Sequence, residues 1–245
     1  MSKTVIYTEG GTEAIRHASA LLHRRGYTVT AVPTEAVTHL LLPVPSLEKD
    51  GRVKGGGPLT AILDQLPADV TVLGGNLPPL ACRCIDFLKD EPYLLKNAAI
   101  TARCAFARIR QSRPITADTG VLIIGWGRIG KQLAPLLQAS GAAVTVSARK
   151  AADLQEVTAQ GYSAVETGLW DTRGFDIIVN TVPAPLLDQT DTKPEALLMD
   201  LASLRGIEGD RVIWARGLPN SDAPEESGML IAETAVRFLS GKEQI

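Results

Sequence analysis

The chain of 245 residues is 45% hydrophobic and 21% charged, with a formal net charge of −2 at pH 7. A chain of this length can bury one or two hydrophobic cores. Its charges are spread without long blocks of one sign, which argues against nucleic-acid or membrane-surface partners. No apolar run reaches the roughly 18 residues of a membrane span and no signal-peptide pattern opens the sequence, so we expect a cytoplasmic protein.

The chain has three cysteines, Cys82, Cys84 and Cys104. An odd and sparse set in a reducing compartment indicates free thiols. Cys82 and Cys84 have no nearby histidine or further cysteine, so no metal site is expected.

The first 96 residues alternate short apolar runs with amphipathic segments. Strands are expected at residues 4–7, 28–32, 39–42 and 70–73, with one helix capped by Thr12 and ended by Gly26 and another at 59–66. This alternation predicts parallel βαβ units and a small α/β domain. Ligands bind beyond the carboxyl ends of strands in open α/β sheets, so Pro43 is a candidate substrate-binding residue, with an ordinary surface loop as the alternative.

A helix is expected from Asn97 to Ser112, because alanines and Ile109 recur there at helical spacing. Arg103, near its start, is a candidate for holding a substrate carboxylate, and a solvated basic helix face is the alternative.

Residues 121–150 read as a strand, a glycine turn, a helix and a second strand. In the G-x-G-x-x-G array Gly125 permits a tight turn, Gly127 lets the backbone approach a pyrophosphate, and Gly130 lets the helix pack closely on the strand. The alternative is a glycine-rich turn without a ligand. Cofactor contacts are predicted for Gly125, Trp126, Gly127, Arg128, Ile129 and Gly130.

The strand at 143–148 ends where an NAD-binding domain usually has an acidic residue for the ribose 2′-hydroxyl. This chain instead has Ser147, Arg149 and Lys150, which suit a 2′-phosphate, so the cofactor expected is NADP, with NAD also possible. The alternative is that Arg149 and Lys150 only begin a solvated helix.

Four more strands are expected, at residues 162–165, 176–180, 197–201 and 212–215. Residues 204–210 are too few for a helical crossover, so either a bare loop joins the last two strands or the last strand is aberrant. A terminal helix opens at Pro224. Further cofactor contacts are expected at the strand ends, from Asn180, Thr181, Val182, Pro183, Asp200, Ala202, Ser203 and Gly217.

The fold class predicted is therefore α/β with two domains. Residues 1–96 form a flavodoxin-like or Rossmann-like substrate domain, and residues 97–245 form an NAD(P)-binding Rossmann domain whose last helix, 224–240, is able to pack back on the first.

The order and spacing of several motifs resemble the dipicolinate synthase A-subunit family over nearly the whole chain. The matching segments are Gly125-x-Gly127-Arg128-x-Gly130, Ser147-Ala148-Arg149, Asn180-Thr181-Val182-Pro183, Asp200-Leu201-Ala202-Ser203, Gly217-Leu218-Pro219 with Ala223-Pro224 and Gly228, Leu42-Pro43-Val44, and Asn97 with Thr101-Ala102.

This resemblance implies an NADP-binding protein of sporulating bacteria that works with a flavoprotein-like B subunit. The family dehydrates and aromatises a cyclic dicarboxylate, 4-hydroxy-tetrahydrodipicolinate, to dipicolinate by removing a hydride and a proton. Substrate-binding residues are then expected at Pro43, Asn97, Arg103, Arg205 and Arg216. Thr101 and Ser203 are candidates for orienting a water in catalysis, although both could only cap a helix or turn. A homo-oligomer is expected.

Four residues depart from the family pattern, and two alternative functions follow. Arg103 replaces an acid, Glu225 a lysine, Asn220 a glycine and Arg216 a proline; Arg103 and Glu225 could be one ion pair with its charges exchanged. One alternative is a dehydrogenase of another carboxylated substrate. The other is a non-catalytic dinucleotide-binding subunit, which the absence of histidine from the second half favours.

Overall fold

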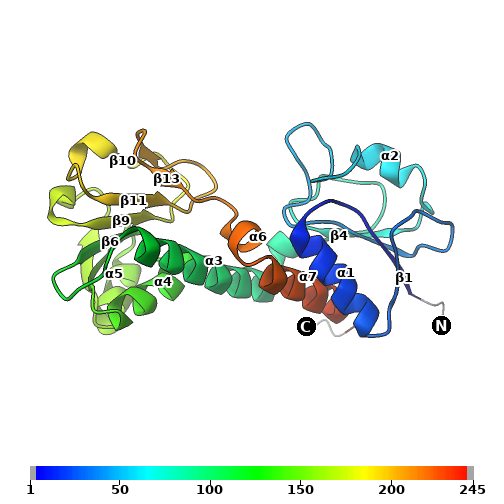
Figure 1. The fold of residues 1–245 in the computed structure, drawn as a ribbon, viewed down its shortest axis with the longest axis horizontal. Coiled ribbons are helices and arrows are strands. Elements are labelled where there is room, and N and C mark those ends of the chain that lie inside the picture. Colours follow the sequence, from blue (N-terminus) through cyan, green and yellow to red (C-terminus); the bar gives the residue numbers. More distant parts are fainter. Residues whose placement is uncertain (1–3, 242–245) are drawn as a thin grey trace. The chain divides into compact units, whose positions relative to one another are not determined.

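The computed structural model describes residues 4–241, which divide into two compact units. The first unit combines the described residues up to Asn97 with those from Pro219 onward, and the second spans Ala98–Leu218. Each unit has its own main sheet, in which all strands run parallel (Figure 1). The predicted α/β class is confirmed.

The first unit is built on a five-stranded sheet in the order β2-β1-β3-β4-β5. This is the flavodoxin-like order expected from the sequence. β2 is a half-exposed edge strand. β5, at the opposite edge, was not predicted, because three residues are too short for an alternating pattern. The strands are β1 (Val5–Thr8), β2 (Thr28–Thr30), β3 (His39–Leu41), β4 (Thr71–Gly74) and β5 (Cys84–Asp86).

Two helices distant in sequence lie side by side in the first unit, α1 (Glu13–Arg24) and α7 (Pro224–Leu239) (Figure 1). Thr12 caps α1 as expected, because its hydroxyl accepts a hydrogen bond from the backbone N–H of Ile15. The helices approach closely at Gly228, where a Cβ would lie 2.5 Å from the carbonyl oxygen of Ala14.

The other helices of this unit are shorter or shared. α2 (Leu59–Leu63) covers one face of the sheet, α6 (Leu218–Asp222) begins at the unit boundary, and α3 (Glu91–Ser112) runs through it. α3 begins six residues before the predicted Asn97, because Asp90 accepts a hydrogen bond from the backbone N–H of Tyr93 and Pro92 suits a first helical turn.

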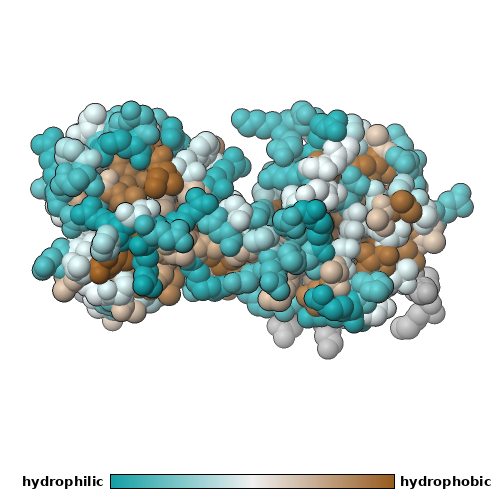
Figure 2. Space-filling model, viewed as in Figure 1, coloured by the Kyte–Doolittle hydropathy of each residue, from teal (hydrophilic) through white to brown (hydrophobic). Residues whose placement is uncertain are grey.

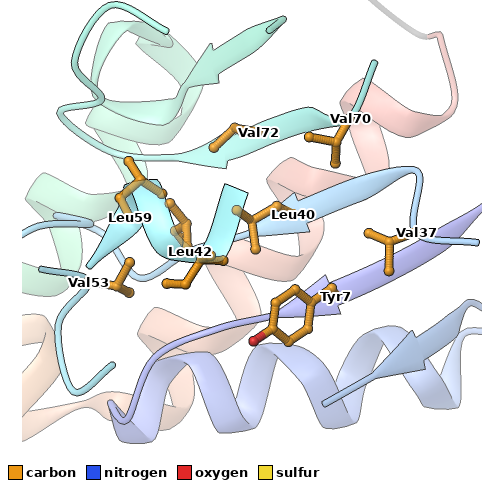
Figure 3. Packing of buried hydrophobic residues seen from close by; sticks show 9 residues of the cluster. Tyr7, Val37, Leu40, Leu42, Val53, Leu59, Val70 and Val72 are labelled. Atoms are coloured by element: carbon orange, nitrogen blue, oxygen red, sulfur yellow. The ribbon is translucent and has the colours of Figure 1, made fainter. Parts of the chain in front are cut away.

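Tyr7 from β1 and aliphatic side chains from β3 and β4 form one core of the first unit under α2 (Figure 3). Leu40, Leu42 and Val72 are fully buried there, and Val53 closes the cluster from a loop. Burying such side chains stabilises the sheet by about 1.5–3 kcal/mol each.

The second unit is built on a six-stranded sheet in the order β13-β11-β9-β6-β7-β8, which is the order of a dinucleotide-binding Rossmann domain. Its helices α4 (Arg128–Ala139) and α5 (Ala151–Ala159) follow β6 and β7. The strands are β6 (Gly120–Ile124), β7 (Ala143–Ala148), β8 (Ser163–Glu166), β9 (Ile177–Asn180), β11 (Leu197–Asp200) and β13 (Ile213–Trp214).

The last crossover of this sheet, between β11 and β13, contains no helix. It carries instead β12 (Ile207–Glu208), which pairs in parallel with β10 (Leu187–Asp188) in a separate two-stranded sheet. The crossover therefore lacks a helix, as the short spacing predicts, but it contains a short strand rather than a bare loop, and β13 is reduced to two residues.

Hydrophilic residues cover much of the visible face of both units, and hydrophobic areas interrupt them (Figure 2). Among residues 4–241 no helix combines the length and apolarity that crossing a membrane requires.

Candidate functional site

A pocket of about 580 Å³ lies at the carboxyl edge of the second unit's sheet. The segments after β6, β7 and β9 meet there, and the strand order reverses between β6 and β9, which is the ligand-binding position of open α/β sheets. The pocket is lined by Gly125, Trp126, Gly127, Ala148, Arg149, Lys150, Asp153, Thr167, Thr181, Val182, Pro183, Ala184 and Leu186.

The three glycines of the turn meet different surroundings. Gly125 has a φ of +105°, and a Cβ there would lie 2.6 Å from the hydroxyl of Thr181. A Cβ on Gly130 would lie 2.2 Å from the carbonyl oxygen of Gly125, so this glycine allows α4 to pack against the turn. A Cβ on Gly127 would meet nothing within 4 Å. The chain's own packing therefore requires Gly125 and Gly130, whereas Gly127 faces open space in the pocket lining.

The amino terminus of α4 provides hydrogen-bond donors at this turn. Gly127 is the N-cap residue, no side chain among residues 4–241 caps the helix, and its first turn contains no acidic residue. The first backbone N–H groups of a helix lack partners within the helix and carry partial positive charge. This arrangement suits an anionic ligand such as a pyrophosphate.

Two exposed cations, Arg149 and Lys150, line the pocket after β7. Among the described residues neither forms an ion pair. Asp153, from the first turn of α5, lines the same pocket and was missed in the sequence, although an acidic residue in a first helical turn is a recognisable signal. The pocket thus offers two positive groups and one carboxylate beyond β7.

Ser147 does not line this pocket. Its side chain is fully buried, and its hydroxyl lies 3.2 Å from that of Thr167, which does line the pocket. Of the three residues predicted to bind a 2′-phosphate, only Arg149 and Lys150 line the pocket. Ser147 contacts the pocket-lining residue Thr167 from the interior of the unit.

The segment after β9 forms the opposite wall and is held by Asn180. The Asn180 side chain donates to the carbonyl oxygen of Val182 at 2.9 Å and accepts from its N–H at 3.0 Å. The Thr181 hydroxyl donates to the carbonyl oxygen of Ile124 at 2.9 Å. Asn180 is fully buried, so it shapes the wall without lining the pocket.

Asp200 connects this wall to the loop after β11. Its fully buried carboxylate accepts hydrogen bonds from the Asn180 amide at 3.0 Å and from the backbone N–H groups of Ala202, Gly206 and Ile207 at 2.9, 2.6 and 2.9 Å. Direct cofactor contacts were expected from Asn180, Asp200 and Ala202; the structure buries all three as supports of the site.

Trp126, the residue between the first two glycines, is 6% exposed and lines the pocket. Its ring lies edge-on to Tyr162 at 5.8 Å between centroids, and the Lys131 ammonium lies 5.7 Å from its centroid. Lys131 also pairs with Glu156 at 2.8 Å and holds the pKa of that carboxyl below its usual range. These contacts fix the indole where a ligand would pass.

The other residues that were predicted to contact the cofactor lie outside the pocket lining. Arg128 and Ile129 begin α4, Gly130 is buried behind the turn, and Ser203 and Gly217 are exposed in the loops after β11 and β13. Their cofactor contacts stay predictions.

The substrate and catalytic candidates are divided between the two units. Thr101, 7% exposed, belongs to the second unit with Arg103, Arg205 and Arg216; Pro43 and Asn97 belong to the first. A joint substrate site, and the pair of Arg103 with Glu225, stay predictions. The departure at Asn220 has a local explanation: its amide donates to the carbonyl oxygen of Val44 at 2.9 Å within the first unit.

In the first unit, the position of the sheet that corresponds to the pocket of the second unit is filled by the described loops of the first unit. Flavodoxin-like sheets bind ligands between β1 and β3. Here a Cβ on Gly10 would lie 2.6 Å from the Pro43 ring, and one on Gly11 would lie 2.9 Å from the carbonyl oxygen of Gly55. Pro43 is thus buried against the glycines, which leaves the second unit as the candidate site.

Comparisons with known proteins agree with this fold. No protein-family model matches the chain. It is 25% identical over 240 residues to the A subunit of dipicolinate synthase from Bacillus subtilis (strain 168), an alignment that covers 86% of this chain and 81% of that protein.

Two solved structures extend the likeness. The structure is similar to the A subunit of dipicolinate synthase from Bacillus halodurans, with a TM-score of 0.84, 20% identity and 98% coverage of both chains. It is also similar to a transhydrogenase from Sinorhizobium meliloti, with a TM-score of 0.71, 16% identity and coverage of 97% and 94%. The resemblance predicted from the motifs is confirmed: the chain is similar to the A subunit of dipicolinate synthase over most of its length and shares its α/β fold.

Proposed function

We propose that this protein is an NADP-dependent oxidoreductase of the dipicolinate synthase A type, which oxidises 4-hydroxy-tetrahydrodipicolinate to dipicolinate. The observation that carries the proposal is the pocket of the second unit in a homologue of the dipicolinate synthase A subunit. The glycine turn and the uncapped start of α4 meet there with Arg149 and Lys150, which form no ion pair among the described residues.

The residues of the pocket fit a nicotinamide dinucleotide. Its volume of about 580 Å³ lies within the range of cofactor pockets. Gly127 leaves space for a pyrophosphate at the start of α4, and Arg149 and Lys150 supply positive charge for a 2′-phosphate. When bound, such a cofactor supplies a hydride acceptor at its nicotinamide ring.

The proposed reaction removes one water, one hydride and one proton from the substrate, which leaves an aromatic pyridine dicarboxylate. Because the substrate carries two carboxylates, cationic groups must hold it, and Arg103, Arg205 and Arg216 are the proposed groups. Thr101 and Ser203 are proposed to orient a water that takes the proton.

In this proposal the protein works in the cytosol of a sporulating cell as a homo-oligomer with a flavoprotein-like B subunit. The relatives' names support the partner, since they identify the similar proteins as one subunit of a synthase.

The test is an absorbance assay for NADPH formation with freshly generated product of dihydrodipicolinate synthase, run with and without the B subunit. Turnover with this substrate supports the proposal, and a requirement for the B subunit supports the partner. Turnover only with another carboxylated acid indicates a related dehydrogenase. Cofactor binding without any turnover indicates a non-catalytic dinucleotide-binding protein, an alternative favoured by the confinement of all three histidines to the first unit.

A further inference from the structure

Arg205 lies in the loop after β11, and its guanidinium carbon is 5.7 Å from the centroid of the Trp214 ring. The ring is itself fixed, because the indole N–H of Trp214 donates to the carbonyl oxygen of Ala202 at 3.2 Å. Trp214 is nevertheless 44% exposed. A guanidinium held over an anchored, half-exposed indole is restricted in orientation before any ligand arrives.

The charge of Arg205 has no counterpart in the described part of the chain. It forms no ion pair there, and its Nε is buried without a hydrogen-bond acceptor. Other arginines of the same unit are used by the fold: Arg113 pairs with Asp176, and Arg211 donates to the carbonyl oxygens of Gln189 and Pro194. Arg205 is partly exposed, so its unpaired charge is available to an anionic ligand.

The backbone of Arg205 is fixed beside the wall of the dinucleotide pocket. The next residue, Gly206, donates its N–H to the buried carboxylate of Asp200 at 2.6 Å. A Cβ on Gly206 would lie 2.7 Å from the carbonyl oxygen of Ala184, which lines the pocket. Arg205 is therefore attached directly to the segment that forms one side of the site.

The position of Arg205 along the sheet separates it from the phosphate-binding turn. Arg205 follows β11, and β9 lies between β11 and β6, which places the two strand ends about 10 Å apart. The start of α4 and the pair Arg149 and Lys150 follow β6 and β7 and already provide for phosphates. A cation at β11 is thus available to a second anionic group.

We propose that Arg205, held on the ring of Trp214, binds one carboxylate of the substrate through the edge formed by its two terminal guanidinium nitrogens. A planar carboxylate matches this edge with two parallel hydrogen bonds. The proposal rests on the proposed function, since it assigns the receptor for one of the two carboxylates of the cyclic substrate, and it adds Trp214 as the positioning residue that orients that receptor.

The test measures dipicolinate and NADPH binding separately by calorimetry in the full-length protein and in Arg205→Lys, Arg205→Gln and Trp214→Leu. We expect both Arg205 variants to bind dipicolinate about 10- to 100-fold more weakly, since lysine has no planar fork, and to keep the affinity for NADPH. Trp214→Leu should weaken dipicolinate binding by a smaller factor. Arg173→Gln, at an exposed arginine of this unit, is the matched control and should change neither affinity. Unchanged NADPH affinity and an unchanged circular dichroism melting curve report that each variant is folded.

The outcomes separate the two proposals. Unchanged dipicolinate affinity in Arg205→Gln overturns the inference about Arg205 and leaves the proposed function standing. Loss of NADPH affinity in folded Arg205→Gln also overturns it, because the guanidinium would then serve a phosphate of the dinucleotide. If the unmodified protein binds NADPH but neither binds nor produces dipicolinate, both proposals fail. If it turns over another carboxylic acid, a raised KM for that acid in Arg205→Gln supports the carboxylate receptor while the dipicolinate assignment fails.

Discussion

At the scale of single residues, the three glycines of the turn make a prediction that separates folding from binding. Gly127→Ala adds a methyl group where no atom of the described residues lies within 4 Å, so we expect the melting temperature to stay nearly unchanged. The same methyl group occupies the space proposed for the pyrophosphate, and we expect NADPH binding to weaken about tenfold or more. Gly130→Ala, whose Cβ would lie 2.2 Å from the carbonyl oxygen of Gly125, should lower both stability and binding.

The matched control for this pair is Gly174→Ala, because a Cβ there also meets nothing within 4 Å in the described part of the chain and Gly174 lies outside the pocket lining. It should change neither property. Tight NADPH binding by Gly127→Ala would place the cofactor away from the start of α4.

The proposed preference for NADP depends on Arg149 and Lys150. Replacing both with alanine removes the positive groups proposed for the 2′-phosphate, so we expect NADPH binding to weaken about 10- to 100-fold while NADH binding changes little. Asp153→Asn should act in the opposite direction, because its carboxylate lines the same pocket and repels a phosphate. Titration of each variant with NADPH and with NADH measures the ratio of the two dissociation constants. Tighter binding of NADH than of NADPH by the unmodified protein would refute the proposed preference.

The sequence predicts the glycine turn because two of its glycines have steric reasons within the turn itself: Gly125 has a positive φ, and Gly130 lies against the carbonyl oxygen of Gly125. It does not separate residues that line a pocket from those that support it. Ser147 and Asp200 are polar residues at strand ends, as a ligand-binding residue would be, yet both point into the protein. Their partners, the Thr167 hydroxyl and the N–H groups of Gly206 and Ile207, come from other segments. The direction of a polar side chain at a strand end is decided by such tertiary contacts.

At the scale of elements, Asp200 holds the loops after β9 and β11 in place. Asp200→Ala leaves four buried donors without their acceptor, one from Asn180 and three from the backbone. We expect a loss of about 3 kcal/mol in the free energy of unfolding and weaker NADPH binding through the displaced wall. Urea unfolding measures the loss. Leu204→Ala, an exposed residue of the same loop, is the control and should change stability little.

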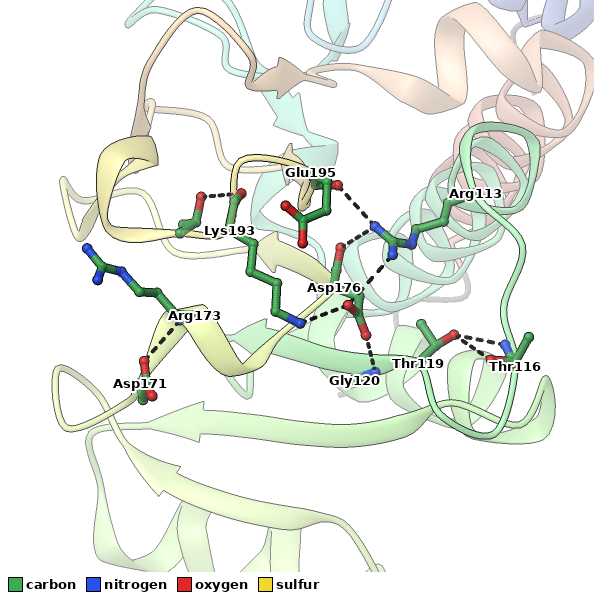
Figure 4. Close-up of polar contacts among 10 residues, drawn as sticks. Arg113, Thr116, Thr119, Gly120, Asp171, Arg173, Asp176, Lys193 and Glu195 are labelled. Carbon is green, nitrogen blue, oxygen red and sulfur yellow. Dashed lines mark hydrogen bonds and ion pairs between the residues drawn. The ribbon is translucent and has the colours of Figure 1, made fainter.

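A second network ties the opposite edge of this sheet to the end of α3 (Figure 4). Asp176 accepts a hydrogen bond from the N–H of Gly120 at 2.9 Å and pairs with Lys193 at 3.0 Å and Arg113 at 3.6 Å. The hydrogen bond from Gly120, followed by Lys193, holds the pKa of the Asp176 carboxyl below its usual value of 3.8. The carboxylate therefore stabilises the fold above this value, and the stabilisation is lost as the pH falls through the lowered pKa.

Asp176→Asn tests this network. We expect it to lose about 1–2 kcal/mol of stability at neutral pH and to show a flatter fall in melting temperature between about pH 5 and pH 2 than the unmodified protein. Thermal unfolding across this pH range measures both effects. Asp118→Asn, in an exposed loop of the same unit, should follow the unmodified curve. If the melting temperatures of Asp176→Asn and of the unmodified protein fall equally as the pH is lowered, the ionised Asp176 carboxylate does not stabilise the fold.

At the scale of the whole molecule, both sheet orders follow from the alternation of strands and helices along the sequence. Parallel strands require crossovers, and the right-handed rule leaves few arrangements. The first unit is less predictable, because it is completed by α7, about 120 residues beyond the point where its first segment ends. The sequence allows the last helix to pack on the first domain, but its amphipathic periodicity does not specify α1 as the partner that it approaches at Gly228.

The distribution of aromatic residues allows the two units to be observed separately. All three tryptophans, Trp126, Trp170 and Trp214, belong to the second unit, so tryptophan fluorescence reports that unit alone, while far-ultraviolet circular dichroism reports the helices of both. Gly228→Val places a branched side chain where even a Cβ would lie 2.5 Å from the backbone of α1. We expect it to destabilise the first unit by about 2–3 kcal/mol.

In urea, Gly228→Val should lower the midpoint measured by circular dichroism and leave that measured by tryptophan fluorescence unchanged, because the added side chain touches only the first unit. NADPH should raise the fluorescence midpoint equally in variant and unmodified protein, since a ligand stabilises the unit that binds it. Met229→Val, at the next and exposed position of α7, controls for the change in helix propensity and should leave both midpoints in place. If both probes shift together in Gly228→Val, the two units unfold in one cooperative transition. The boundary at Asn97 and Pro219 then separates two sets of contacts, but the units on either side of it are not independently stable.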